Sequence, residues 1–310
     1  PEEARTKLEA VLARPDVDTV FFGTSHVWRS IDPELFDERM TEGGVPSKSY
    51  NFGLRRLTRG ETRALLRLIA DRHEGEIRRV FVEPTDNTIF HPELINSWRA
   101  RNLLQPGFLP ELALMAHHGE ITPRQFARGM LLISANATNA GVLADRLNPL
   151  LPDPHELPVS SNGFDPLHLD ATDPKLRARR QTLLENRDLA LERIAEIQDA
   201  AWTPGNGLPE KQERIFERFR FDLWVITYAP VSFVVFPNLL EPTEPRLFTN
   251  SLNAGAFRDG HYSFANPEEH PAFYEFDAWF DPGHLNASSA RLFTEKLAEE
   301  VVRRESAAKE

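Results

Sequence analysis

The feature that most constrains the fold of this chain is a run of β-favouring residues that leads into Gly-Thr-Ser. Residues 19–22, Thr-Val-Phe-Phe, are followed by Gly23 and then by Ser25. A continuous apolar run is typical of a strand buried on both faces of a parallel sheet. Gly23 permits a tight turn, so we expect Ser25 at the carboxyl edge of that strand. A serine there is either a nucleophile reached by a base or the N-cap of the next helical turn.

Strand and helix patterns alternate in the N-terminal part of the chain. Apolar residues at helical spacing predict helices over residues 3–13 and 59–72. Short apolar runs predict strands over residues 49–54 and 79–83. Such alternation predicts an α/β fold, a three-layer α/β/α sandwich with a parallel central sheet.

The middle of the chain is richer in helical patterns, which occur over residues 92–104, 110–118, 122–133, 139–147, 175–201 and 208–218. Residues 148–173 are rich in Pro, Asp, His and Ser and are long enough to form a functional loop or lid. β-favouring runs predict two further strands, at residues 223–228 and 232–236. We therefore expect one domain over residues 1–310, with a helical insertion at about 91–220.

Composition excludes several classes of site and partner. A formal net charge of −11 disfavours nucleic acid or an anionic membrane surface as the main ligand. The chain has no cysteine, so disulfides and thiolate metal sites are excluded. No run approaches ~18 apolar residues, so no membrane span is expected. His117, His118 and His155 lack metal-ligand spacing and no nucleotide-binding glycine motif occurs, so we expect neither a metal ion nor a cofactor.

An acidic residue and a histidine lie three positions apart near the C-terminus. Asp281 and His284 precede an amphipathic helix predicted over residues 287–304. This spacing allows a carboxylate to hold the Nδ1–H of the imidazole and to leave Nε2 able to take a proton. The residue types also allow another interpretation, in which Asp281 and Asn286 cap the helix and His284 lies at the surface.

Together, these two motifs resemble the SGNH (GDSL-type) hydrolase superfamily. The resemblance rests on Gly-Thr-Ser at 23–25 and on Asp-Pro-Gly-His-Leu-Asn at 281–286. Phe-Gly-Thr-Ser-His with Ile-Asp-Pro-Glu-Leu-Phe at 31–36 is also similar to a bacterial branch of cell-envelope proteins that move acyl groups onto polysaccharides. The resemblance covers residues 18–90 and 270–304.

The resemblance implies roles for individual residues. Ser25 would be the nucleophile, His284 the base and Asp281 the carboxylate that orients it. Oxyanion donors would be the backbone N–H groups of Ser25 and Gly53 and the side chain of an asparagine. Where the family has a Gly-x-Asn-Asp block, this chain reads Val-Glu-Pro-Thr-Asp-Asn, which makes Asn87 the candidate.

Residues beside these motifs have ordinary structural interpretations. No partner for His26 is recognisable, so a structural role is favoured over a substrate contact. Trp28 and Arg29 could line a sugar- or acyl-binding cleft, but packing of the first helix after the turn is favoured. The alternating charges of residues 175–201 indicate a solvated helix face or coiled packing against a partner.

The expected function is that of a serine-dependent esterase or O-acyltransferase. It would act on acyl esters, foremost acetyl, of a carbohydrate polymer through an acyl-enzyme at Ser25. The alternative is a non-catalytic polysaccharide-binding or assembly component that retains the fold. A membrane acyltransferase is a possible partner of the insertion. The sequence begins at Pro1, which is typical of a fragment or processed form. The resemblance implies an extracytoplasmic (periplasmic or cell-envelope) location, with a signal or anchor upstream.

Overall fold

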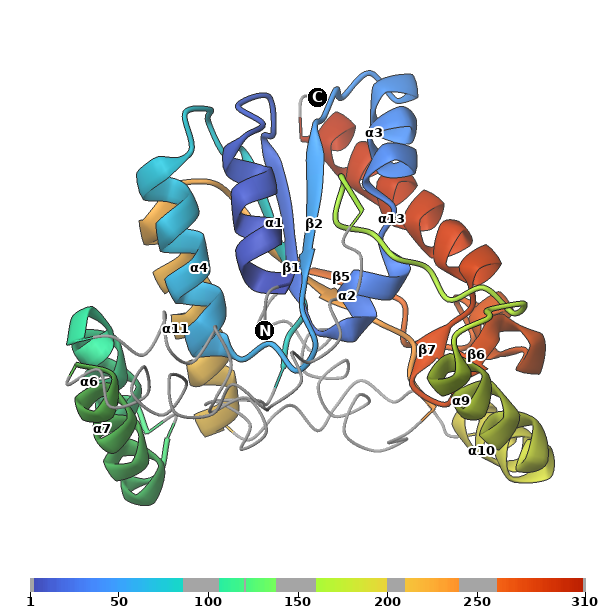
Figure 1. Ribbon diagram of the computed structural model, residues 1–310. Helices are drawn as coiled ribbons and strands as arrows, with labels where there is room; N and C mark the ends of the chain where they lie inside the picture. Colours follow the sequence, from blue (N-terminus) through green and yellow to red (C-terminus); the bar gives the residue numbers. More distant parts are fainter. Residues whose placement is uncertain are drawn as a thin grey trace.

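A parallel sheet of five strands forms the centre of the structure, a computed structural model (Figure 1). The structure describes residues 3–85, 106–119, 121–137, 160–199, 210–239 and 261–308. The strand order is β2-β1-β3-β4-β5, and every neighbouring pair is parallel. The strands are β1 (Thr19–Gly23), β2 (Ser49–Gly53), β3 (Arg79–Val82), β4 (Val231–Val235) and β5 (His261–Ser263). The β1–β4 predictions are confirmed, whereas β5 was not predicted.

Alternate residues of the strands point into two apolar cores. Val20 and Phe22 of β1 belong to one core and Phe21 to the other, as expected for a strand buried on both faces. The first core is covered by α1 (Glu3–Leu12), α4 (Arg59–Arg72) and α11 (Glu210–Thr227). The second is covered by α3 (Pro33–Glu42) and α13 (Ala287–Ala307). Figure 1 shows the two helical layers on opposite faces of the sheet, which confirms the α/β prediction.

Helix α11 corrects one prediction. Residues 223–228 were expected to form a strand, but α11 continues to Thr227. Phe216, Phe219 and Leu223 are buried at helical spacing against the sheet, whereas Trp224, the next residue, is 43% exposed. The helical spacing of the buried residues therefore outweighs the local β propensity of residues 223–228, as expected for a helix that packs on one side.

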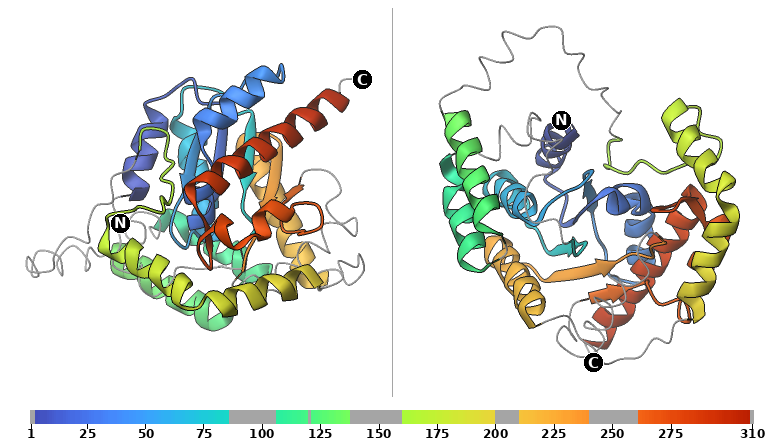
Figure 2. Two further views of the ribbon diagram at one scale, coloured as in Figure 1. Left: turned by 90° about the vertical axis from the view of Figure 1, so that its right-hand side faces the viewer. Right: turned by 90° about the horizontal axis from the view of Figure 1, so that it is seen from below.

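Four helices lie between β3 and α11 in the described part of the chain. They are α6 (Leu109–His117), α7 (Pro123–Ala137), α9 (Pro174–Glu185) and α10 (Arg187–Asp199). These helices confirm the predictions at 110–118, 122–133 and 175–201, with a break at Asn186 in the last. The helices predicted at 92–104 and 139–147 lie outside the described residues. Seen from below, the α6–α7 and α9–α10 pairs stand on opposite sides of the sheet (Figure 2).

A short hairpin precedes the last helix. Strands β6 (Trp279–Asp281) and β7 (His284–Leu285) pair antiparallel, apart from the central sheet. Figure 1 places this hairpin beside α9. The helix predicted over 287–304 is confirmed as α13.

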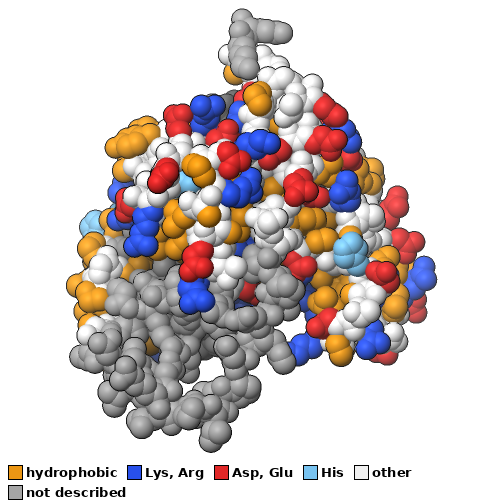
Figure 3. All heavy atoms as spheres, turned by 45° about the horizontal axis from the view of Figure 1, so that its top comes forward, with side chains coloured by type: hydrophobic (Ala, Val, Ile, Leu, Met, Phe, Trp, Pro, Cys, Tyr) orange, Lys and Arg blue, Asp and Glu red, His pale blue; other side chains and the backbone are white. Residues whose placement is uncertain are grey.

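The outer surface carries mixed charges. Asp and Glu side chains alternate with Lys and Arg over the face displayed in Figure 3, so no single-sign field dominates it. Of the helices that the structure describes, none is long and apolar enough to cross a lipid bilayer.

Gly53 ends β2 directly under α2 (Ser25–Ser30), and this contact yields a stability prediction. We expect Gly53→Ala to lower the free energy of unfolding by about 3 kcal/mol. The physical reason is that an alanine β-carbon would lie 2.2 Å from the backbone nitrogen of Trp28. Urea unfolding followed by circular dichroism measures the change. Gly107→Ala is the control, since nothing lies within 4 Å of a β-carbon there, and it should change stability by less than about 0.5 kcal/mol. Wild-type stability of Gly53→Ala would contradict the close packing.

Candidate active site

Ser25 is the first residue of α2, just after the turn that ends β1. The helix N-cap is Thr24, whose hydroxyl accepts a hydrogen bond from the backbone nitrogen of His26 at 3.3 Å. The interpretation of Ser25 as the N-cap is therefore wrong. Gly23 is required at this turn because a β-carbon there would lie 2.7 Å from both Cβ and Oε2 of Glu83.

His284 reaches Ser25 from the other end of the chain. Its Nε2 lies 2.8 Å from Ser25 Oγ, and its Nδ1 lies 2.8 Å from Asp281 Oδ1. Asp281 ends β6 and His284 begins β7, so a hairpin rather than a loop carries them. The His284 side chain is only 11% exposed, and Asn286 alone caps α13 by accepting from Ser289 N. The structure thus brings the three residues together, and the interpretation of Asp281 as a helix cap is wrong.

The contacts define the protonation state of the three residues. A carboxylate only accepts hydrogen bonds, so Nδ1 of His284 donates to Asp281, and in the neutral ring Nε2 then accepts from the Ser25 hydroxyl. Burial lowers the pKa of His284 below 6.5; Asp281 opposes this, while the charges of His26 and Arg179 add to it. Burial alone would raise the pKa of Asp281, but hydrogen bonding and the charges of His284 and Arg179 hold it below 3.8. At neutral pH, the site therefore holds a neutral imidazole beside a carboxylate.

Two arginines of α9 contact this hairpin. Arg179 forms an ion pair with Oδ2 of Asp281. Its Nη2 also lies 3.0 Å from Nδ1 of His284, but both nitrogens are donors in this tautomer, so the ion pair is the attractive contact. Arg180 Nη1 donates to the carbonyl of Trp279 at 2.6 Å. We expected a solvated face here, and no motif distinguishes these two among the 36 lysines and arginines.

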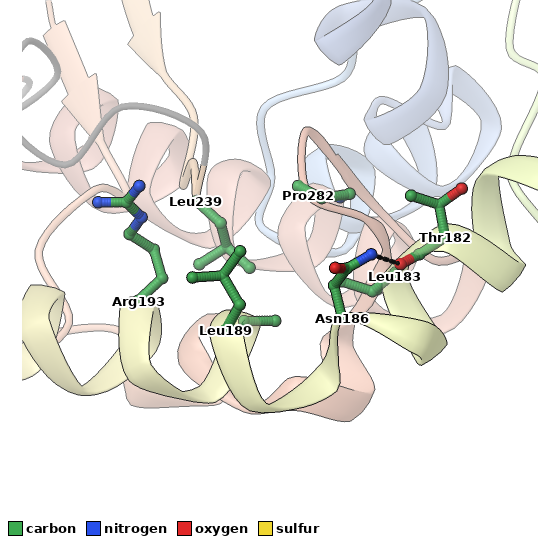
Figure 4. Close-up of a pocket in the computed structure, with 8 residues that line it drawn as sticks. Thr182, Leu183, Asn186, Leu189, Arg193, Leu239 and Pro282 are labelled. Atoms are coloured by element: carbon green, nitrogen blue, oxygen red, sulfur yellow. Dashed lines mark hydrogen bonds between the residues drawn. The ribbon is translucent and has the colours of Figure 1, made fainter.

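A mostly apolar pocket of about 260 Å³ lies beside the hairpin. Figure 4 shows Leu183 and Leu189 from α9 and α10 on one side and Pro282 and Leu239 on the other. Pro282 directly follows Asp281, so the pocket and the triad share the hairpin turn. An apolar group fits such a lining better than a charged one.

A second histidine–carboxylate pair adjoins Ser25. Glu83, the residue after β3, is buried, and its carboxylate accepts from the backbone nitrogen of Thr24 and, at 3.1 Å, from the Thr24 hydroxyl. Glu83 Oε1 also lies 2.7 Å from Nδ1 of His26. Burial would raise the pKa of Glu83, but His26 and Thr24 hold it below 4.5. Burial alone would lower the pKa of His26, but Glu83 and Asp281 raise it above 6.5. His26, which has no partner recognisable in the sequence, is thus paired with a carboxylate.

The three predicted oxyanion donors have different outcomes. The backbone N–H of Ser25 has no acceptor among the described residues. The N–H of Gly53 donates to Oδ1 of Asn51 at 2.9 Å, and the space where a β-carbon would lie is filled by the backbone of Trp28. This is a correction, since the glycine serves helix packing and its amide already has an acceptor. Asn87 lies outside the described residues.

Trp28 and Arg29 pack beneath the turn, as favoured from the sequence. Trp28 is 1% and Arg29 6% exposed. The guanidinium of Arg29 stacks on the Trp28 ring at 4.0 Å and pairs with Asp165 at 2.5 Å. Neither side chain lines an open cleft.

Residues 162 and 163 lie against the edge strand β2. Asn51 N donates to the carbonyl of Asn162 at 3.0 Å. The buried Lys7 Nζ donates to Gly163 O at 2.7 Å and to two carbonyls of β2. The described part of the predicted 148–173 loop is therefore docked on the edge of the sheet at residues 162 and 163 and on α2 and α13 at residues 165 and 167. Residues 148–159 lie outside the described ranges.

Metal-binding groups were also sought in the described ranges. There, no cluster of three or more His, Cys, Asp or Glu side chains could hold a metal ion. The rings of His117 and His118 lie 5.4 Å apart, without a third ligand group among those residues. His155 lies outside them.

Asp281 gives an acid-stability prediction. Its pKa is lower in the folded chain than its ordinary 3.8. It therefore stabilises the fold above pH 3.8, and this contribution is lost as the pH falls through the folded-state pKa. We expect the free energy of unfolding, measured in urea from pH 2.5 to 6, to depend less on pH in Asp281→Asn than in the wild type. Asp188→Asn on the exposed face of α10 is the control and should keep the wild-type slope. Equal slopes in wild type and Asp281→Asn would contradict the assignment.

Comparison with known proteins assigns no family to this chain. No protein-family model matches it, and no curated protein matches it significantly. The resemblance to SGNH hydrolases therefore rests on the sequence motifs alone. A function has to be inferred from the geometry around Ser25.

Proposed function

We propose that this protein is a serine-dependent esterase or O-acyltransferase with an SGNH-type fold. Its substrate would be an acyl ester, foremost an acetyl ester, of a carbohydrate polymer. The polymer class and an extracytoplasmic location come from the motif resemblance to cell-envelope acyl-transfer proteins. A membrane acyltransferase that docks on the insertion helices belongs to the same proposal.

One observation carries the proposal. Ser25 Oγ lies 2.8 Å from a histidine nitrogen whose other ring nitrogen lies 2.8 Å from a buried carboxylate. This arrangement matches the nucleophile–base–acid geometry of hydrolases with covalent acyl intermediates. The lowered pKa of His284 supports it, because a base must be unprotonated at the working pH.

The acylation step gives each of the three residues a role. Ser25 Oγ forms a bond to the ester carbonyl carbon while its proton passes to Nε2 of His284. The imidazolium that results is stabilised by Asp281. Collapse of the tetrahedral intermediate breaks the bond to the alcohol oxygen, which takes the proton from His284. The acyl group remains on Ser25.

Deacylation repeats the same steps with a new hydroxyl. Water or a sugar hydroxyl gives its proton to His284 and attacks the acyl carbonyl. Collapse of this second tetrahedral intermediate breaks the bond between the acyl carbon and Ser25 Oγ, which takes the proton back from His284. Water gives an esterase and a sugar hydroxyl gives a transferase. The outcome depends on how the acceptor is held and how far water is excluded.

A non-catalytic binding or assembly component is the second candidate. The observation that favours it is the Gly53 amide, which donates to Asn51 instead of facing an oxyanion. Loss of one oxyanion donor typically costs about 3 kcal/mol of transition-state stabilisation. Such a cost slows an esterase and does not by itself abolish nucleophilic reactivity.

Labelling with a fluorophosphonate probe, followed by peptide mapping, tests the proposal. We expect an adduct at Ser25 in the wild type and none in Ser25→Ala. His284→Ala should react at least about 100-fold more slowly, because general-base catalysis is lost. In both variants, the rate of p-nitrophenyl acetate hydrolysis should fall together with the labelling.

Controls separate loss of chemistry from loss of fold. Circular dichroism and unfolding midpoints of both variants should match those of the wild type. Ser288→Ala changes an exposed serine four residues after His284 and should leave labelling at the wild-type rate. A folded wild type that takes no label would favour the binding component over the enzyme.

A further inference from the structure

His26 and His284 lie side by side at the Ser25 turn. Their ring centroids are 5.4 Å apart. His26 Nδ1 lies 2.7 Å from Glu83 Oε1, and His284 Nε2 lies 2.8 Å from Ser25 Oγ. Two positive charges at such a separation repel each other, so the charge of one ring affects the protonation of the other.

The surroundings of His26 favour its charged form. Glu83 faces it from the end of β3, and Asp281 and the backbone of Gly283 face it from the hairpin. These groups raise the pKa of His26 even though its burial acts in the opposite direction. Glu83 itself is held ionised by hydrogen bonds from Thr24, so its charge is present to pair with the imidazolium.

The groups around His284 have opposite effects on its charge. Asp281 favours the imidazolium, whereas burial and the charges of His26 and Arg179 favour the neutral ring. Arg179 already pairs with Asp281, which reduces the attraction that this carboxylate exerts on a proton at His284. Of the two rings, His26 is therefore the one that carries the charge near neutral pH.

We propose that His26 is a positioning residue whose imidazolium, held by Glu83, keeps the neighbouring His284 in the neutral form that accepts a proton. His26 acts through His284 and needs no contact with substrate. The inference rests on the proposed function only in giving His284 the task of a base. The charge relation between the two rings is a separate property and can be measured in a protein that is not an enzyme.

A histidine titration followed by NMR in the full chain tests the charge relation directly. The ring C–H resonances of His26 and His284 are assigned from the signals that disappear in His26→Gln and His284→Gln. In the wild type, His284 should titrate at lower pH than His26. In Glu83→Gln, the His26 midpoint should move to lower pH, because the paired carboxylate is lost. If His284 titrated at higher pH than His26 in the wild type, this result alone would overturn the proposal.

Two substitutions of His26 separate charge from shape. In His26→Gln, the His284 midpoint should move to higher pH, because the neighbouring cation is gone. His26→Lys keeps a positive charge and should leave the His284 midpoint near its wild-type value. A purely structural role predicts similar behaviour of the two variants. An unmoved His284 midpoint in folded His26→Gln would also overturn the proposal.

The fluorophosphonate reaction provides the second readout. The labelling rate should rise with pH as His284 loses its proton, and this rise should occur at higher pH in His26→Gln than in the wild type or His26→Lys. Normal labelling with an unmoved pH profile overturns the inference and leaves the proposed function standing. No labelling in any variant, together with the expected shift of the His284 NMR midpoint, supports the inference and removes the proposed function.

Discussion

The conformation of the Ser25 turn depends on one buried carboxylate. Removing a carboxylate from water costs several kcal/mol unless hydrogen bonds or a counter-charge replace the water. Glu83 receives its donors from Thr24 and its counter-charge from His26, the residues on either side of Ser25. The turn that satisfies Glu83 is therefore the turn that presents Ser25. Gly23 is part of the same constraint, because a side chain there would overlap Glu83.

The other half of the site depends on the insertion. The hairpin that carries Asp281 and His284 pairs with no strand of the central sheet. Its first strand is contacted instead by α9, through the hydrogen bond of Arg180 to a main-chain carbonyl and the ion pair of Arg179. Truncating one partner of a partly buried ion pair leaves the other uncompensated, so α9 affects both the placement and the charge of the acid. Among the described helices between β3 and β4, α9 thus contributes directly to the geometry of the site.

The parts of the structure that local pattern determines could be predicted from sequence. Apolar runs and helical periods placed β1 to β4 and most helices, and the motifs indicated Ser25, His284 and Asp281. The strand predicted at 223–228 failed because Phe216, Phe219 and Leu223 define a period that a six-residue window does not contain. The partners of His26 and Asp281 could not be predicted, since both are distant in sequence. The pairing of β1 with β3 brings Glu83 to His26, and the packing of α9 on the hairpin brings Arg179 to Asp281. At Gly53 the motif predicted an oxyanion donor, but the structure explains the glycine by the close approach of the Trp28 backbone.

The described residues around Ser25 differ in their exposure. On the side of β2, Gly53, Trp28 and Arg29 are buried, and Asp165 closes over Arg29. On the other side, His26 and His284 are half-buried and open in part to solvent. Under the proposed function, the Ser25 amide at the helix start and the imidazolium proposed for His26 would both favour negative charge developing on an acyl oxygen.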